Sequence, residues 1–254
     1  MTNKALFNWS SGKDSALALY KTLQNPEYQI SCLLTSVNKQ FQRVSMHGIR
    51  VSLLEQQAKS IGLPLEIMEI PEMPTMEAYE EVMSQTLHKL KLEGVTHSIF
   101  GDIFLEDLRK YREEKLDSIG FEAVFPLWKT PTVDLIQEFI SLGFKTIVVC
   151  VNERFLDKSF VGRVINQQFI DDLPEGVDVC GENGEFHTFT FDGPIFSKAV
   201  QFETGEIVYR KYERPKQDDA SDKACDTSAT DAFDYGFWYC DLIDIASQKI
   251  DFAQ

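Results

Sequence analysis

Short apolar runs alternate with segments of helical periodicity through the first two-thirds of the chain. We predict strands at residues 4–9, 30–37, 64–70, 96–102 and 145–151 and helices at residues 14–23, 48–61, 76–93, 105–119 and 133–142. Alternation at this spacing predicts βαβ units and therefore a parallel sheet. In the helix at 105–119, an apolar stripe is expected to face the protein, with five charged residues turned away from it: Arg109, Lys110, Arg112, Glu113 and Glu114.

The balance of charge narrows the classes of function. The 254 residues include 25 lysines and arginines against 40 aspartates and glutamates, a formal net charge of −15. Nucleic acids are bound chiefly through lysine and arginine, so this balance argues against a broad nucleic-acid surface but not against a site for one nucleotide. No apolar stretch approaches the roughly 20 residues of a membrane span, and no secretory signal is visible. We expect a cytoplasmic protein without a membrane partner.

Cysteine usage fits the same compartment. The five cysteines, at positions 32, 150, 180, 225 and 240, lie far apart in the sequence. They form neither a CxxC pair nor a zinc-ligand spacing, so a disulfide framework or structural zinc is not indicated. Reduced thiols are the expected state.

The character of the sequence changes after about residue 174. Residues 181–194 and 199–213 are predicted to form two β-hairpins, because Asn-Gly and Thr-Gly stand at their centres. The polar stretch that begins near residue 214 has no periodicity and predicts a flexible linker. The aromatic stretch 232–243 is expected to dock on its own domain or on a second copy, because free it would be an exposed apolar patch.

The corner between the first predicted strand and helix, "SSGKDS" at residues 10–15, has the composition of an anion site. A βα turn presents backbone N–H groups at a helix N-terminus, where they bind phosphate. Gly12 permits close approach of the backbone, the hydroxyls of Ser10, Ser11 and Ser15 can donate hydrogen bonds, and Lys13 adds a positive charge. Asp14 suits either the helix dipole or a Mg²⁺ ion bridged to phosphate.

Two alternatives limit how this corner is interpreted. The Walker A spacing and the GxGxxG pattern are both absent, so the corner predicts a phosphate loop of another kind. The other interpretation is a capped helix after a buried strand. The run of hydroxyl, glycine and lysine residues favours the phosphate loop.

The corner resembles the SGGxDS loop of the PP-loop (N-type) ATP pyrophosphatases, with Ser11 in place of the second glycine. Five further blocks resemble, in order, those of the diphthine–ammonia ligase-like family. They are "HGIR" at 47–50, "FGDIFLEDLRKYRE" at 100–113, "VFPLW" at 124–128, "VDVCGENGEFHTF" at 177–189 and "DGPIF" at 192–196. The resemblance covers about residues 4–210.

The resemblance implies an α/β fold of HUP type (adenine nucleotide alpha hydrolase-like). A parallel sheet with helices on both faces would be joined by a smaller α+β C-terminal substrate domain. The expected divisions are residues 1–125 for nucleotide binding, 126–214 for the substrate and amidation, and 215–254 for the linker and aromatic tail. The implied activity is adenylation of a carboxylate by ATP, with release of AMP and pyrophosphate, followed by transfer of ammonia.

Further site residues follow from the blocks. Gly101 and Asp102 end a predicted strand, the edge at which open parallel sheets bind ligands, and the resemblance implies nucleotide or Mg²⁺ contact. The metal ligands are expected to be Asp14 and Asp102. His47 and Arg50 precede a helix on the same predicted edge, and the family match favours phosphate or ribose contact.

Three titratable residues in "GENGEFH" are predicted to act on the amine or the acceptor: Glu182, Glu185 and His187. With Lys13 and Asp14 they form the expected catalytic set. Asn183 and His187 depart from the EGGE form of the diphthine branch, and the form with histidine resembles a mainly bacterial branch associated with corrinoid salvage. For all these residues the alternative is a structural turn or helix start.

The leading hypothesis is an ATP- and Mg²⁺-dependent carboxylate–ammonia ligase whose acceptor is a small molecule or is borne on a protein. The alternatives are a corrinoid-salvage amidation enzyme, a tRNA-modifying PP-loop enzyme and a non-catalytic nucleotide sensor. A tRNA enzyme predicts a basic surface and, for thiolating types, paired cysteines, which this sequence lacks. The oligomeric state stays open, with a homo-oligomer among the options.

Overall fold

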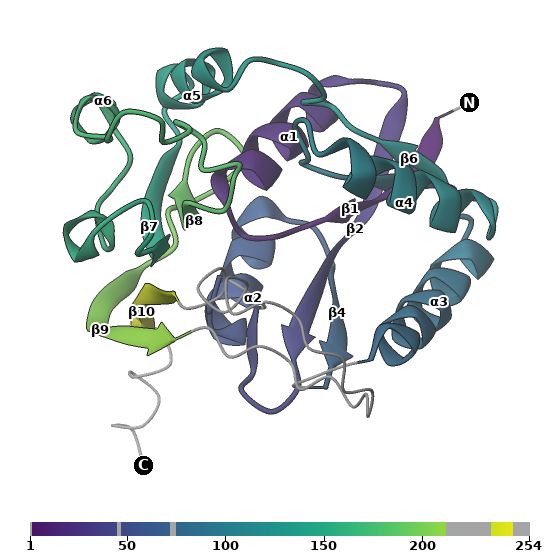
Figure 1. Ribbon diagram of the computed structural model, residues 1–254. Helices are drawn as coiled ribbons and strands as arrows, with labels where there is room; N and C mark the ends of the chain where they lie inside the picture. Colours follow the sequence, from purple (N-terminus) through teal and green to yellow (C-terminus); the bar gives the residue numbers. More distant parts are fainter. Residues whose placement is uncertain (1, 45–46, 72–74, 212–234, 246–254) are drawn as a thin grey trace, which may run out of the picture.

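A parallel sheet forms the N-terminal part of the protein. The computed structural model describes residues 2–44, 47–71, 75–211 and 235–245. The parallel strands lie in the order β4-β2-β1-β5-β6 (Figure 1), and their bounds are β1 Asn3–Asn8, β2 Tyr28–Asn38, β4 Leu65–Ile70, β5 His97–Ile99 and β6 Glu122–Val124. The short β3 (Arg43–Val44) pairs antiparallel with the end of β2. The direction of the strand order changes between β1 and β5, which creates the crevice where such sheets bind ligands.

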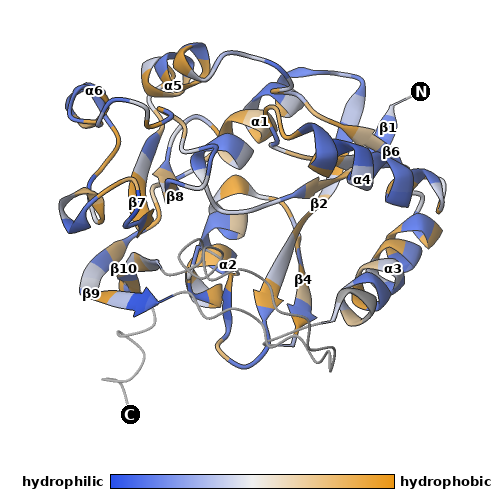
Figure 2. Ribbon diagram, in the orientation of Figure 1, coloured by the Kyte–Doolittle hydropathy of each residue, from blue (hydrophilic) through white to orange (hydrophobic). Residues whose placement is uncertain are grey.

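Helices cover both faces of this sheet, because successive strand residues point to opposite sides. On one face, Phe7 and Leu33 join a core with α1 (Lys13–Gln24) and α2 (Val51–Ile61). On the other face, Leu6 and Leu34 join a smaller core with α3 (Met76–Leu92) and α4 (Glu106–Asp117). In Figure 2, hydrophobic colour follows the sheet and hydrophilic colour covers most of α4. The predicted α/β class with helices on both faces is confirmed.

A second, antiparallel sheet lies beside the first (Figure 1), with the strand order β8-β7-β10-β9. Its strands are β7 Lys145–Asn152, β8 Phe186–Asp192, β9 Phe202–Lys211 and β10 Gly236–Asp244. Three short helical segments accompany it: α5 Thr132–Ser141, the 3-10 turn Lys158–Phe160 and α6 Gln167–Asp171. The core that packs on α1 and α2 continues into this sheet through residues such as Val149 and Phe189. The two parts are therefore joined by one continuous hydrophobic core.

One prediction about strands is wrong, and one strand of the parallel sheet is not predicted. The run 145–151 belongs to the antiparallel sheet, and the fifth parallel strand is the three-residue β6. An apolar run buried on both faces fits either kind of sheet, and β6 is too short for its period to be visible.

The two predicted hairpins are also absent from the described residues. The Asn183–Gly184 turn precedes β8, whose partner is β7. Thr204 and Gly205 lie inside the continuous strand β9. A Cβ on Gly205 would lie 3.0 Å from the Cδ1 atom of Ile243, so the glycine serves close packing between strands.

The aromatic C-terminal stretch contains β10, which pairs with both β7 and β9. The expected docking of this stretch on its own domain is thus seen for residues 236–244. The predicted linker that begins near residue 214 lies outside the described residues, so it stays a prediction. Among the described helices, none is both long and apolar enough to cross a membrane.

Candidate active site

A cavity of 1290 Å³ opens at the carboxyl ends of the parallel strands. Its wall is made by the turn between β1 and α1, the ends of β2 and β5, helices α3 and α4, and the segment before β8. Ten of the predicted site residues line it: Ser10, Gly12, Lys13, Asp14, Ser15, His47, Gly101, Asp102, Glu182 and His187. The structure therefore brings most of the predicted site to one place.

Helix α1 begins at this cavity without a side-chain cap. Gly12 is its N-cap residue, with extended backbone, and because it has no side chain it makes no capping hydrogen bond of its own. The Ser10 hydroxyl donates to Ser15 Oγ at 3.1 Å, and the Lys13 N–H donates to Thr188 Oγ1 at 3.0 Å. The end of β5 approaches closely, because a Cβ on Gly101 would lie 3.0 Å from the Ser15 nitrogen. A helix N-terminus of this kind favours an anion.

Ser11 has an unusual backbone and lies outside the cavity wall. Its φ of 71° is left-handed, the conformation in which glycine is preferred. Its carbonyl accepts hydrogen bonds from the Thr190 N–H at 2.9 Å and from Gln57 Nε2 at 3.1 Å. Serine thus adopts here a backbone angle that favours glycine, and its predicted nucleotide contact is not supported by its position.

Lys13 is a buried cation that is paired with its neighbour. Its Nζ lies 2.8 Å and 2.7 Å from the two Asp14 carboxylate oxygens and 5.6 Å from the centre of the Phe186 ring. Burial by itself lowers the pKa of Lys13, but Asp14, Cys180 and Glu182 raise it above its ordinary value. Lys13 therefore stays charged at neutral pH and can offset negative charge in the cavity.

Asp102 makes an ion pair that the sequence did not reveal. Arg112 Nη1 lies 2.9 Å from Asp102 Oδ2, and its guanidinium stacks over Phe100 at 4.2 Å. Burial and Asp14 raise the pKa of Asp102, although Arg112 opposes them. Arg112 lines the cavity, so the prediction that it is turned away is wrong. Its spacing of four residues from Leu108 and Leu116 was the available signal.

The segment before β8 gives its two glutamates different environments. Glu182 is half-buried in the cavity wall, and burial together with Asp14 raises its pKa to about 8. Glu185 is fully buried and accepts hydrogen bonds from the backbone of Asp178 at 3.0 Å and of Asn183 at 2.8 Å. Glu185 thus holds the turn in shape and does not line the cavity, in contrast to its predicted role.

His47 and His187 form a pair beside the corner at residues 10–15, which is called the phosphate corner below after its predicted ligand. Their ring centres are 4.8 Å apart, and His47 Nδ1 lies 3.1 Å from the Thr188 carbonyl oxygen. A carbonyl only accepts hydrogen bonds, so His47 carries its proton on Nδ1. Burial lowers the pKa of His47 to about 4 and that of His187 to about 3, with Lys13 acting in the same direction. Both rings are neutral at physiological pH.

Arg50 does not line the cavity. Its guanidinium donates two hydrogen bonds to the carboxylate of Asp241 in β10, from Nε to Oδ1 at 3.2 Å and from Nη2 to Oδ2 at 2.6 Å. The predicted phosphate or ribose contact is therefore not supported by its position. Thr188 is the opposite case, since no local pattern marks it and only the packing of β8 brings it to α1.

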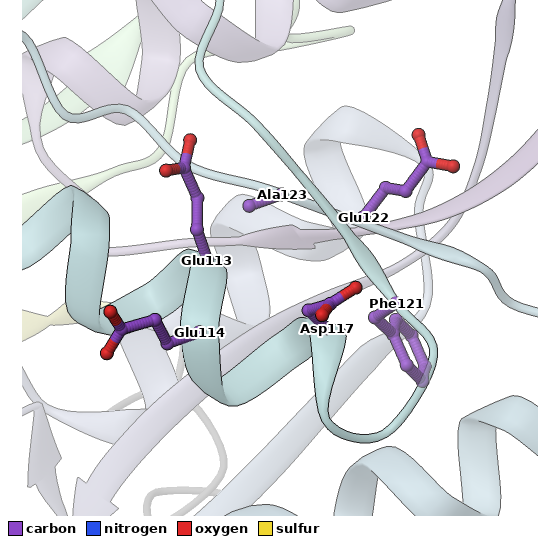
Figure 3. Close-up of a pocket in the computed structure, with 6 residues that line it drawn as sticks. All are labelled: Glu113, Glu114, Asp117, Phe121, Glu122 and Ala123. Carbon is purple, nitrogen blue, oxygen red and sulfur yellow. The ribbon is translucent and has the colours of Figure 1, made fainter.

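A smaller cavity of 420 Å³ lies at the end of α4 and the start of β6 (Figure 3). It is lined by Glu113, Glu114, Asp117, Phe121, Glu122 and Ala123. No lysine or arginine is among the residues that line it, and two of its four carboxylates are already paired outside it, Glu113 with Arg109 at 2.6 Å and Glu114 with Lys110 at 3.9 Å, so it has no evident ligand. Within the described residues, no group of three or more His, Cys, Asp or Glu side chains has the arrangement of a metal site.

The fold and the large cavity together define the class. This is an α/β protein in which a helix N-terminus lies at the switch point of the parallel sheet, with titratable groups from the segment before β8 and from β8 in the same cavity.

Two family models match this chain. The diphthamide synthase N-terminal domain matches residues 3–123 and the diphthamide synthase C-terminal domain matches residues 131–215. The chain belongs to the diphthine–ammonia ligase-like family.

Individual relatives agree with the family. Over 134 residues the chain is 31% identical to the diphthine–ammonia ligase of Bos taurus and 30% identical to that of Homo sapiens, in each case 50% of this chain and 49% of the relative. The chain thus spans about half the length of the curated relatives it matches. The closeness to a bacterial branch stays a prediction.

Among solved structures, the U34-tRNA thiolase NcsA of Methanococcus maripaludis with its [4Fe-4S] cluster is similar at 16% identity. The match covers 56% of this chain and 58% of the thiolase, with a TM-score of 0.36. A likeness this low carries no weight for function.

Proposed function

We propose that this protein is an ATP-dependent ligase that adenylates a carboxylate and then transfers ammonia to it. One observation carries the proposal: the start of α1, with Lys13 and Asp14, shares a cavity with Glu182 and His187. An anion site alone would suit a nucleotide sensor. Titratable groups within the same cavity give the second half of an amidation reaction a place to occur.

The cavity suits ATP and Mg²⁺ as ligands. Gly12 gives helix α1 no side-chain cap of its own, although the Lys13 N–H already donates to Thr188 Oγ1, and the lack of a side chain at Gly101 lets the end of β5 pack against the corner. Asp102 Oδ2 is buried and makes no hydrogen bond within the described residues, despite its ion pair with Arg112. Mg²⁺ in nucleotide sites binds one or two carboxylates, so Asp14 and Asp102 would hold it. When bound, it would offset charge on the phosphates.

In the first step, a carboxylate oxygen of the acceptor attacks the α-phosphorus of ATP, the bond to the β-phosphate breaks, and pyrophosphate leaves. The N-terminus of α1 and Lys13 stabilise the charge that builds on the leaving pyrophosphate. Ser10 and Ser15 orient the phosphates by hydrogen bonds. Residues 1–125 would thus form the nucleotide-binding domain.

In the second step, the nitrogen of ammonia attacks the carbonyl carbon, the carbon–oxygen bond to AMP breaks, and an amide forms. The surplus proton on nitrogen passes to the Glu182 carboxylate. A pKa of about 8 suits this task, because a general base works best when its pKa is near the operating pH. The neutral rings of His47 and His187 accept hydrogen bonds from the amine. Residues 126–214 would form the amidation domain.

The acceptor follows from the relatives rather than from the cavity. Their name makes diphthine the first acceptor to test, and ammonium ion the nitrogen donor. A panel of other carboxylic acids, including corrinoid carboxylates, follows if diphthine is inactive.

The test is product analysis with a matched pair of variants. Protein, ATP, Mg²⁺, ammonium and diphthine are incubated, and nucleotides are separated by ion-exchange chromatography. We expect AMP and pyrophosphate in equal amounts. Lys13→Ala should abolish turnover, whereas Lys21→Ala, in the last turn of the same helix and paired with Glu138 at 2.6 Å, should retain it. Formation of ADP and phosphate without AMP, or full activity of Lys13→Ala, would contradict the proposal.

A further inference from the structure

Strand β10 lies beyond the residues matched by either family model, which end at 215. It is nevertheless an interior strand, between β7 and β9. Phe237, Trp238 and Tyr239 pair with Asn152, Val151 and Cys150 of β7. On its other side, β7 pairs with β8, the strand that carries His187 and Thr188. A segment outside the family match is therefore built into the sheet that supplies part of the cavity.

Asp241 of β10 is held by two arginines. Arg50, the N-cap residue of α2, binds it through both Nε and Nη2, a fork geometry that fixes direction as well as charge. Arg43 Nη1 lies 2.9 Å from Asp241 Oδ1. Burial raises the pKa of Asp241, but the hydrogen bonds from Arg50 and Arg43 lower it below its ordinary value, so the carboxylate is charged at neutral pH.

Arg43 extends this contact to the residue next to His47. The same Nη1 atom donates a hydrogen bond to the Gly48 carbonyl oxygen at 2.6 Å. Tyr239 of β10 also packs there, since a Cβ on Gly48 would lie 3.4 Å from its Cδ1 atom. Gly48 has a φ of 67°, so the chain turns sharply at this point. β10 thus fixes the turn after His47 in two ways.

His47 in turn contacts both halves of the cavity. A Cβ on Gly12 would lie 3.1 Å from His47 Cε1, so the ring rests against the phosphate corner. Its Nδ1–H donates to the Thr188 carbonyl, and its ring lies on His187. Asp241, Arg43, the Gly48 carbonyl and His47 therefore form one continuous series of contacts from β10 to the cavity.

We propose that Asp241 is a positioning residue, which acts through Arg43 and Gly48 to hold the His47 ring against Gly12 and His187. The contribution of His47 to amidation rests on the proposed function, whereas its position does not. The C-terminal strand then sets the geometry of the amine site without touching any substrate.

The experiment compares Asp241→Asn with a matched control. Asn keeps the shape of the side chain and removes its charge. Asp192→Asn is the control, because Asp192 pairs with Lys145 at 2.8 Å within the same sheet and does not line the cavity. The chain has 4 histidines, so the imidazole nitrogens of ¹⁵N-labelled histidine can be assigned by substitution and observed by NMR. The wild-type His47 should show the Nδ1-protonated tautomer.

We expect Asp241→Asn to shift the His47 nitrogen resonances and to mix its tautomers, while Asp192→Asn leaves them unchanged. In the amidation assay, Asp241→Asn should slow amide formation by roughly 2- to 30-fold, the range seen for coupling through side-chain networks, with pyrophosphate exchange little affected. Wild-type His47 resonances in Asp241→Asn would overturn the proposal. Equal shifts in both variants would also overturn it, because they would indicate general loosening of the sheet.

A second variant covers a failure of Asp241→Asn to fold. Arg43→Lys keeps the positive charge but, with a single ammonium group, cannot reproduce the guanidinium bridge between Asp241 and Gly48. It should shift the same His47 resonances, and unchanged resonances would overturn the proposal. If the wild-type protein forms no amide but these shifts occur, the proposed function fails while the role of Asp241 stands.

Discussion

The left-handed backbone of Ser11 strains the phosphate corner, and we predict that substitution of Ser11 can remove this strain. Its φ is 71°, and its hydroxyl is buried and makes no hydrogen bond within the described residues. A left-handed angle costs a residue other than glycine about 1–2 kcal/mol. A buried hydroxyl without a partner costs about 1–3 kcal/mol. Two substitutions separate these contributions.

Ser11→Ala removes the hydroxyl and keeps the strained angle, whereas Ser11→Gly removes both. Glycine also gains about 0.5–1 kcal/mol of conformational freedom in the unfolded chain, which opposes the relief of strain. We therefore expect Ser11→Ala to be more stable than the wild type by about 1 kcal/mol. Ser11→Gly should be more stable than Ser11→Ala by about 0.5–1 kcal/mol. In a chain of this size, 1 kcal/mol raises the Tm by about 2–4 °C.

The assay is urea unfolding followed by tryptophan fluorescence, with the slope against urea checked for constancy. ATP affinity measured by calorimetry should be the same in both variants, because Ser11 does not line the cavity. If Ser11→Gly is no more stable than Ser11→Ala, the backbone is not strained and the reasoning fails. A loss of ATP binding in both variants would restore the nucleotide contact that the family resemblance implies.

Two further predictions concern pH. The pKa of Glu182 is about 8 in the folded protein and about 4.5 in the unfolded protein. Between these two pH values unfolding releases a proton, so the free energy of unfolding falls as pH rises, by up to about 1.4 kcal/mol per pH unit. In urea unfolding from pH 6.5 to 8, Glu182→Gln should flatten the dependence of the unfolding free energy on pH, and an unchanged dependence would refute the raised pKa. The same variant should block amide formation while pyrophosphate exchange continues. His187 titrates near pH 3 when folded and near 6.5 when unfolded, so it makes the protein less stable as pH falls below 6.5. In the Glu182→Gln background, His187→Gln should reduce that loss, and an equally steep loss would mean that the ring is protonated in the folded state.

The order of strands and helices could be predicted because it depends on local periodicity. The five predicted helices and five predicted strands all exist, within a few residues of their expected ends. The assignment of residues 145–151 to the parallel sheet was wrong, since the partner of an apolar strand is decided by packing between segments that lie far apart in the sequence. The turn predicted at Thr204–Gly205 was wrong for a related reason, because the sequence does not distinguish a glycine that makes room for Ile243 from a glycine in a turn.

Part of the candidate site could likewise be predicted. The phosphate corner and Gly101 come together because carboxyl ends of neighbouring parallel strands meet at one edge. Thr188 and Arg112 were not foreseen, since each depends on which side chain faces the cavity after packing. Glu185 shows the converse. Its chemistry suggested catalysis, and only the hydrogen bonds from Asp178 and Asn183 reveal a side chain that shapes a turn.

Gln57 explains why the two parts of the chain share one cavity. This fully buried amide of α2 accepts a hydrogen bond from Trp9 Nε1 at 2.9 Å and donates to the carbonyls of Ser11 at 3.1 Å and Thr190 at 2.6 Å. Moving the second sheet away from the phosphate corner would break two of the hydrogen bonds that cross to it, the one from Gln57 to the Thr190 carbonyl and the one from the Thr190 N–H to the Ser11 carbonyl, and each buried group left unpaired would cost about 1–3 kcal/mol. The corner and the strand that carries His187 are thus held together without a ligand. On the proposed function, an adenylated acceptor would already lie beside Glu182 when it forms, so ammonia could attack it without a domain movement between the two steps.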